Sequence, residues 1–295
     1  MIDFSQINLL NQIILSFTFL LAAALIIGFS ELLVSSQLRA TDRKKNKIKI
    51  EVKRIIFKPL KLIREIDQIT YLSLIKILIL LTLCFSCWGS FFYTQQGDLK
   101  LSPYLYYLFS FSLFIFFNIF NEIDRFSAET YLKKRDEGYY LLLLFVNLVL
   151  VYITMGLTFG TLNFDTISLI QSLEYKSIPF IGALQNPPLF ILSLSILTSF
   201  RAYCMQVKST SNFIISSFFY INLILFLVNM FLSGLNILNY YPYKIFFVFL
   251  LAIGIELFHI NGFSRLDKLI DNQIKKIMPF NLFILAASLV VNIAF

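Results

Sequence analysis

Four carboxylates near the ends of long apolar stretches are the residues of this sequence best suited to chemistry. Glu31, Glu122, Asp124 and Glu256 all lie toward the same side of a membrane if the apolar stretches cross it in alternating directions. Ionisable groups are costly in lipid and usually mark a proton pathway, an ion pair or the interior of a helix bundle. Side chains near a helix end can also reach the membrane surface. We therefore treat the four as candidate proton-path or paired carboxylates, with ordinary charges at helix ends as the alternative.

The sequence has no metal-binding or catalytic-triad motif. Its one histidine is His259, so neither a histidine metal cluster nor a Ser-His-Asp triad can form. Cys84 and Cys87 have C-x-x-C spacing, but they lie in an apolar stretch without a second cysteine pair, so we interpret them as small lipid-facing residues. No P-loop or dinucleotide-binding glycine pattern occurs. We expect any redox chemistry that this chain serves to reside in partner subunits.

The composition indicates which elements must position these residues. Of 295 residues, 58% are hydrophobic, 17% are aromatic and only 14% are charged, and the mean hydropathy is +0.77. Soluble domains carry roughly 25% charged residues, so this composition excludes an ordinary soluble domain and predicts an integral membrane protein. The three cysteines are too few for a disulfide framework.

Apolar stretches separated by polar clusters predict an all-α polytopic membrane protein, a single domain over residues 1–295 with about eight transmembrane helices. Lipid offers no partners to an open backbone, and the uninterrupted apolar runs lack the alternation of a membrane barrel. The first stretch follows no basic residue and ends in no cleavage pattern, so we expect a retained helix and not a secretory signal. The predicted spans are residues 9–34, 71–93, 104–121, 139–160, 187–206, 212–233, 243–260 and 278–295.

The distribution of positive charge predicts the orientation of these spans. Of the 25 Lys and Arg residues, all but Lys76, Lys100, Lys176 and Lys244 lie on one side of the membrane if the helices alternate, in loops or, for Arg201, near the adjoining end of a span. By the positive-inside rule these loops are cytoplasmic, which places both termini outside the inner membrane of a bacterial cell. The net charge of +8 is thus a signal of topology, and we do not expect nucleic-acid binding.

The first basic loop contains a predicted amphipathic helix over residues 48–69. Its apolar residues recur three and four positions apart, with Lys and Arg between them. Such a helix would lie on the membrane surface or against a partner subunit. A basic loop attracted to anionic lipid is the alternative, and composition alone does not separate the two.

Several motifs occur in an order that resembles a known family. They are Glu31 followed by Gln37-Leu38-Arg39, the stretch Lys58-Pro59-Leu60-Lys61-Leu62-Ile63-Arg64-Glu65, Arg125-Phe126-Ser127-Ala128-Glu129 preceding the fourth span, and Phe263-Ser264-Arg265-Leu266-Asp267-Lys268-Leu269 preceding the last. Together they are similar to the quinone-site membrane subunit of respiratory complex I and to its relatives in membrane-bound, energy-converting hydrogenases.

The resemblance implies a membrane-arm subunit of a proton-translocating NADH:quinone oxidoreductase. Such a subunit would form a quinone chamber together with partner subunits. In that chamber quinone approaches an iron–sulfur cluster of a peripheral arm. The subunit would also contact other membrane-arm subunits and the lipid bilayer. No metal or nucleotide is expected in this chain. The residues implied in quinone-site or peripheral-arm docking are Arg39, Arg43, Lys58, Lys61, Arg64 and Arg201.

The sequence also departs from the family. Thr198 and Met205 occupy positions where the family has a Glu and an Asp, and Val207-Lys208-Ser209-Thr210 replaces an acidic loop. An acidic residue expected in the sixth span falls near Phe219. These losses leave two alternatives open: a scaffold or assembly protein of the same fold without quinone chemistry, and an independent transporter.

Overall fold

The computed structural model describes residues 9–37, 71–91, 103–120, 128–160, 186–206, 210–231, 246, 248–252, 254–255 and 270–294. These residues are almost entirely helical and include no strand, which confirms the all-α class for this part of the chain. Within these described ranges, three helical segments are long and apolar enough to cross a membrane: Arg135–Thr158, Pro187–Cys204 and Ile270–Val290. The predicted surface helix over residues 48–69 lies outside the described residues, and the predicted span over residues 243–260 is described only in part.

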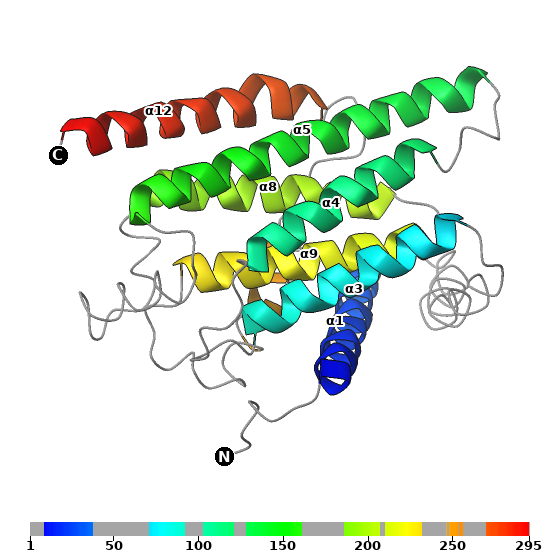
Figure 1. Cartoon of the computed structure of the whole chain (residues 1–295). Coiled ribbons are helices and arrows are strands. Elements are labelled where there is room, and N and C mark those ends of the chain that lie inside the picture. The colour runs from blue at the N-terminus through cyan, green and yellow to red at the C-terminus, as the bar shows by residue number, and fades with distance from the viewer. Residues whose placement is uncertain are drawn as a thin grey trace, which may run out of the picture.

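The helices form one layered bundle (Figure 1). They are α1 (Leu9–Gln37), α3 (Tyr71–Phe91), α4 (Pro103–Phe120), α5 (Ala128–Phe159), α8 (Pro187–Gln206), α9 (Thr210–Phe231), the π-helical turn η4 (Gln273–Ile277) and α12 (Met278–Ala294). Helix α9 contacts α1, α3, α4 and α8. Helix α1 crosses beneath α3 and α9 at a steep angle, while α12 lies beside α5 at the opposite margin (Figure 1).

Helix α9 is the centre of the bundle. Every residue from 215 to 231 is buried, so this helix is enclosed by protein on all sides over that length. Helix α12 shows the contrary pattern, with Phe283 69% and Val290 66% exposed on its outer face. A membrane helix that buries one face and exposes apolar side chains on the other is suited to contact with lipid.

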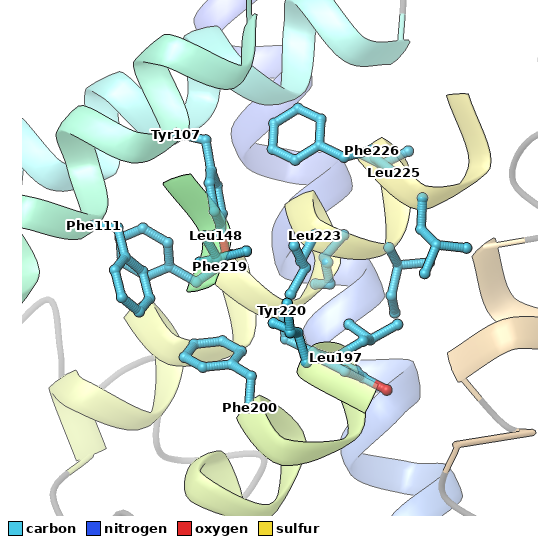
Figure 2. Packing of buried hydrophobic residues seen from close by; sticks show 14 of the residues in the cluster. Tyr107, Phe111, Leu148, Leu197, Phe200, Phe219, Tyr220, Leu223, Leu225 and Phe226 are labelled. Carbon is cyan, nitrogen blue, oxygen red and sulfur yellow. The ribbon is translucent and has the colours of Figure 1, made fainter. Parts of the chain in front are cut away.

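Aromatic rings from α4 and α9 fill the core between these helices. Phe111 and Phe219 meet edge to face at 5.2 Å, and Tyr107 meets Phe226 in the same manner at 5.1 Å (Figure 2). Edge-to-face contacts match the positive edge of one ring to the negative face of another. Since lipid is as apolar as these side chains, close packing rather than transfer out of water holds the helices together.

The start of α8 follows from its first residues. Asn186 is the N-cap, because its Oδ1 accepts a hydrogen bond from the Leu189 N–H at 3.2 Å. Pro187 and Pro188 follow, at positions where the missing N–H costs nothing because it would have no partner within the helix. The helix therefore covers the same residues as the predicted window 187–206.

Helix α5 begins at Ala128, earlier than the predicted window over residues 139–160. Its added residues include Ala, Glu, Leu, Lys and Arg, which favour helix formation although several of them are too polar for lipid. The motif Ala128-Glu129 thus lies inside the helix and does not precede it. With 32 residues, α5 is about 48 Å long, and its first turns extend past the neighbouring helix ends (Figure 1).

The structure corrects the placement of Cys84 and Cys87. They are 2% and 0% exposed, so they lie in the bundle interior and not toward lipid. The reason is the position of α3, which packs against α1, α4 and α9 and so has little lipid-facing surface in its second half. Cys204 is buried as well, and none of the three forms a disulfide.

Burial of all three thiols predicts their chemical behaviour. In the folded protein, a membrane-impermeant maleimide should leave Cys84, Cys87 and Cys204 unmodified, because the reagent cannot reach a thiol that is closed off by packed helices. After denaturation in sodium dodecyl sulfate, mass spectrometry should find all three labelled. Rapid labelling of any of them before denaturation would contradict the described packing.

Candidate functional site

Arg201 is the one predicted site residue whose side chain the structure places. It lies near the end of α8 and is fully buried, with its guanidinium Cζ 5.3 Å from the centroid of the Tyr220 ring of α9. An arginine over an aromatic face gains a cation–π interaction, which is strongest where water is excluded. The guanidinium is also more weakly hydrated than an ammonium, so it tolerates burial better than a lysine would.

Aromatic side chains from three other helices enclose the end of α8. On either side of Arg201 in sequence, Phe200 lies 5.7 Å from Phe111 of α4 and Tyr203 lies 5.7 Å from Tyr140 of α5, measured between ring centroids. The Tyr140 hydroxyl donates a 2.6 Å hydrogen bond to the Ser199 carbonyl. The buried charge therefore lies in a closely packed aromatic surround.

The remaining predicted site residues are placed as follows. Glu31 falls within α1. The other carboxylates and cations named above lie outside the described residues: Arg39, Arg43, Lys58, Lys61, Arg64, Glu122, Asp124 and Glu256. Their assignment as docking or proton-path residues stays a prediction.

A cluster of three buried amide side chains joins α5, η4 and α12, and we call it the amide cluster. Asn147 Nδ2 donates to Gln273 Oε1 at 2.9 Å and to the Leu143 carbonyl at 3.1 Å. Asn281 Nδ2 donates to the carbonyl and to Oδ1 of Asn147, at 3.0 and 3.1 Å. Polar side chains that bond across helices act as local ties within a membrane bundle.

The π-helical turn helps to place two members of this cluster on one helix face. The Met278 N–H bonds to the Gln273 carbonyl, five residues back, which widens the helix by one residue at this turn. Gln273, Ile277, Asn281 and Ile284 are all buried, so they form a continuous inward stripe. Turns of this type occur frequently at functional sites.

Sequence reasoning missed the amide cluster because it searched the spans for ionisable residues. Asn147 lies inside the apolar run Leu141–Val151, and Asn281 directly precedes another apolar run, Leu282–Ala287. An uncharged amide inside or next to an apolar run could have indicated a buried polar site, since a buried amide also needs hydrogen-bond partners. Their pairing across distant parts of the chain could not be read from sequence.

Breaking this cluster should destabilise the bundle. Asn147→Leu removes two side-chain hydrogen bonds between helices, so we expect the free energy of unfolding to fall by about 2 kcal/mol, measured by titration with a denaturing detergent. Asn222→Leu is the matched control, because the hydrogen bond that Nδ2 of this buried asparagine makes to the Phe218 carbonyl is within its own helix. Equal losses for the two variants would contradict a stabilising role for the cluster.

Two cavities accompany these sites. One, of about 20 Å³, is large enough for a single water molecule, and Tyr104, Ser193 and Met230 are among its lining residues. The other is an open cleft of about 480 Å³ between the beginnings of α5 and of the last helix. It is lined by Arg135, Asp136, Tyr139, Ile270 and Asp271.

Two ion pairs border this cleft. Arg135 bonds to Asp136 and Lys275 bonds to Asp271, both at 3.2 Å and both substantially exposed. Exposed pairs of this kind add little stability. They do keep charged, hydrated groups at the mouth of the cleft.

Comparisons with known proteins do not identify a family for this chain. No family model matches the chain, and no curated protein matches it. Among the described residues, no group of three His, Cys, Asp or Glu side chains could hold a metal ion.

Proposed function

We propose that the chain is a membrane-arm subunit of a proton-translocating NADH:quinone oxidoreductase. In this proposal it crosses a bacterial inner membrane with about eight helices, both termini lie outside, and the large basic loop is cytoplasmic. Its partners are other membrane-arm subunits and the iron–sulfur subunits of a peripheral arm. Quinone is the cofactor, held where this chain meets those partners.

The observation that carries the proposal is the buried Arg201. It is a fully buried arginine beside Tyr220 in an aromatic surround, and the family resemblance implies a docking or quinone-site role for it. A fixed positive charge favours electron-rich oxygen ligands nearby, because it needs no reorganisation when negative charge develops. This supports a positioning role for Arg201 near a quinone entrance.

The proposed quinone chamber lies between this chain and its partners. The 20 Å³ cavity admits no quinone ring, since sites for ligands of that size have volumes of several hundred Å³. We therefore assign no chemical step to a quinone inside this bundle. The proposal has Arg39, Arg43, Lys58, Lys61 and Arg64 form the docking surface for the peripheral arm.

The four carboxylates complete the proposal. Glu31, Glu122, Asp124 and Glu256 remain its candidates for proton transfer, because a carboxylate can bind and release protons in a desolvated channel. Helix α5 adds an exposed Arg135 near the end that the proposed topology assigns to the cytoplasm, which suits contact with an acidic partner surface.

Purification from native membranes in mild detergent tests this proposal. The chain should co-purify with iron–sulfur subunits, and the preparation should reduce quinone with a nicotinamide or related donor. An isolated chain without partners, or a defined substrate that it transports alone, would overturn the assignment. The products of neighbouring genes give a rapid second check, since antiporter-like and iron–sulfur subunits should be among them.

A scaffold of the same fold without quinone chemistry is the second candidate, and Thr198 favours it. The Thr198 hydroxyl donates to the Ser195 carbonyl of its own helix at 2.9 Å. A side chain bonded to its own backbone in this way cannot replace the proton-binding carboxylate that the family has at this position. A complex that keeps full quinone reductase activity after this chain has been stripped from it would support the scaffold.

A further inference from the structure

The amide cluster contains buried polar atoms whose bonding is incomplete. Asn281 Oδ1 has no hydrogen-bond partner in the part of the chain that the structure describes, and Gln273 Nε2 has none of good geometry there, although the Gln273 side chain lies against the Tyr140 hydroxyl. Both residues are fully buried. Leaving such an atom unsatisfied is unfavourable in a folded protein. Native proteins commonly remove this cost with an ordered water molecule.

The two atoms define the ligand that would satisfy them. Gln273 Nε2 is a donor and needs an acceptor, whereas Asn281 Oδ1 is an acceptor and needs a donor. A metal cation would face the donor unfavourably, and an anion would face the acceptor unfavourably. Water both donates and accepts, so it fits both atoms.

Neighbouring groups offer further bonds to such a water. The Gln273 side chain lies beside the Tyr140 hydroxyl, whose proton is already donated to the Ser199 carbonyl. The lone pairs of that hydroxyl oxygen can accept another hydrogen bond. A buried water typically makes about three hydrogen bonds, and this junction supplies groups of both kinds.

The open cleft lies at the end of the same helix junction. Tyr139 and Asp271 line the cleft, whereas Tyr140 and Gln273, one and two residues further along the same helices, are fully buried. Less than one helical turn therefore separates Asp271 from Gln273, whereas Asn147 lies eight residues beyond Tyr139 on α5, which is more than two turns. Gln273 is therefore the member of the amide cluster that lies nearest to the hydrated cleft.

We propose that the junction of α5, η4 and α12 is a hydrated site, in which one or two water molecules from the cleft bind Gln273 Nε2 and Asn281 Oδ1. The site extends aqueous access from the Asp271 end of the cleft to Tyr140 in the bundle. It does not depend on quinone chemistry, so its tests stand apart from the test of the proposed function.

Hydroxyl-radical labelling of the purified full-length chain in lipid nanodiscs tests the bound water. Radicals generated from a bound water modify the side chains next to it, so Tyr140 should be oxidised in the wild type although it is buried. The double variant Gln273→Leu, Asn281→Leu should lower the Tyr140 oxidation rate several-fold, while Ile284→Leu, on the same helix face, should not change it.

The direction of the change separates loss of water from loss of structure. An unfolded double variant would expose Tyr140 and raise its oxidation rate, so either a rise or an unchanged rate overturns the proposal. A cryo-electron microscopy map at about 2 Å gives a second measurement. It should show density about 3 Å from Gln273 Nε2 or Asn281 Oδ1, the usual hydrogen-bond distance, and an empty junction at that resolution overturns the site.

Cysteine accessibility tests the route. Asp271→Cys, in the cleft, should react with a charged maleimide in nanodiscs. Leu142→Cys should not react, because its exposed position on α5 lies in an apolar stretch that faces lipid. An unreactive Asp271→Cys would overturn access of water through the cleft.

Discussion

Arg201→Ala should lower kcat/KM for quinone by roughly tenfold to a hundredfold in a complex that still assembles. That range corresponds to about 1.5–3 kcal/mol, which we expect to be lost because the fully buried Arg201 no longer holds the end of α8 in place, and not because it touches quinone. We expect most of the effect in KM, because Arg201 is proposed to position the entrance and not to take part in electron transfer. Steady-state kinetics of the purified complex, with quinone varied, measures both parameters.

Two further variants separate charge from packing. Arg201→Lys keeps the positive charge but loses the planar guanidinium over Tyr220, so its kcat/KM should lie between that of the wild type and that of the alanine variant. Lys275→Ala removes a lysine whose side chain is 69% exposed and which has no part in the proposed docking surface, so it should leave quinone kinetics unchanged. An assembled Arg201→Ala complex with unchanged activity would count against this site.

Phe219→Ala should cause a large loss of stability, about 3–5 kcal/mol. The Phe219 ring is fully buried and lies 5.5 Å from Tyr107, 5.2 Å from Phe111 and 5.2 Å from Phe114. Removing it opens a cavity where helices α4 and α9 meet and forfeits contacts with all three rings. Unfolding in a mixed-micelle titration measures the change in free energy.

Phe283→Ala is the matched control for this prediction. Phe283 is 69% exposed on the outer face of α12, so its removal should change the free energy of unfolding by less than about 0.5 kcal/mol. Comparable losses for the two variants would mean that Phe219 is not a central packing residue.

The positions of the helices could largely be predicted from hydropathy, whereas their environments could not. The window 212–233 and helix α9, and the window 278–295 and helix α12, differ by only a few residues where the structure describes them. Both windows are similarly apolar, yet α9 is enclosed by protein and α12 exposes Phe283 and Val290. Lipid and protein interior are equally apolar, so hydropathy does not separate the two environments.

The candidate site was predictable only in part. Arg201 was implied by the family resemblance, although a cation between apolar residues is also expensive in a membrane helix. Gln273, Asn147 and Asn281 are uncharged, and their partners come from distant parts of the chain. The wider turn at Gln273–Ile277 depends on backbone hydrogen bonds shifted by one residue, such as that from the Met278 N–H to the Gln273 carbonyl, and no residue pattern in the sequence indicates them.

The length of α5 has a mechanical consequence. A hydrocarbon layer is about 30 Å thick and this helix is about 48 Å long, so α5 is roughly 18 Å longer than the layer that it could cross. The helix is continuous from Ala128 to Phe159. Because the helix is continuous and rigid, a protein that pulls on its Ala128 end would also displace Asn147, which lies further along the same helix.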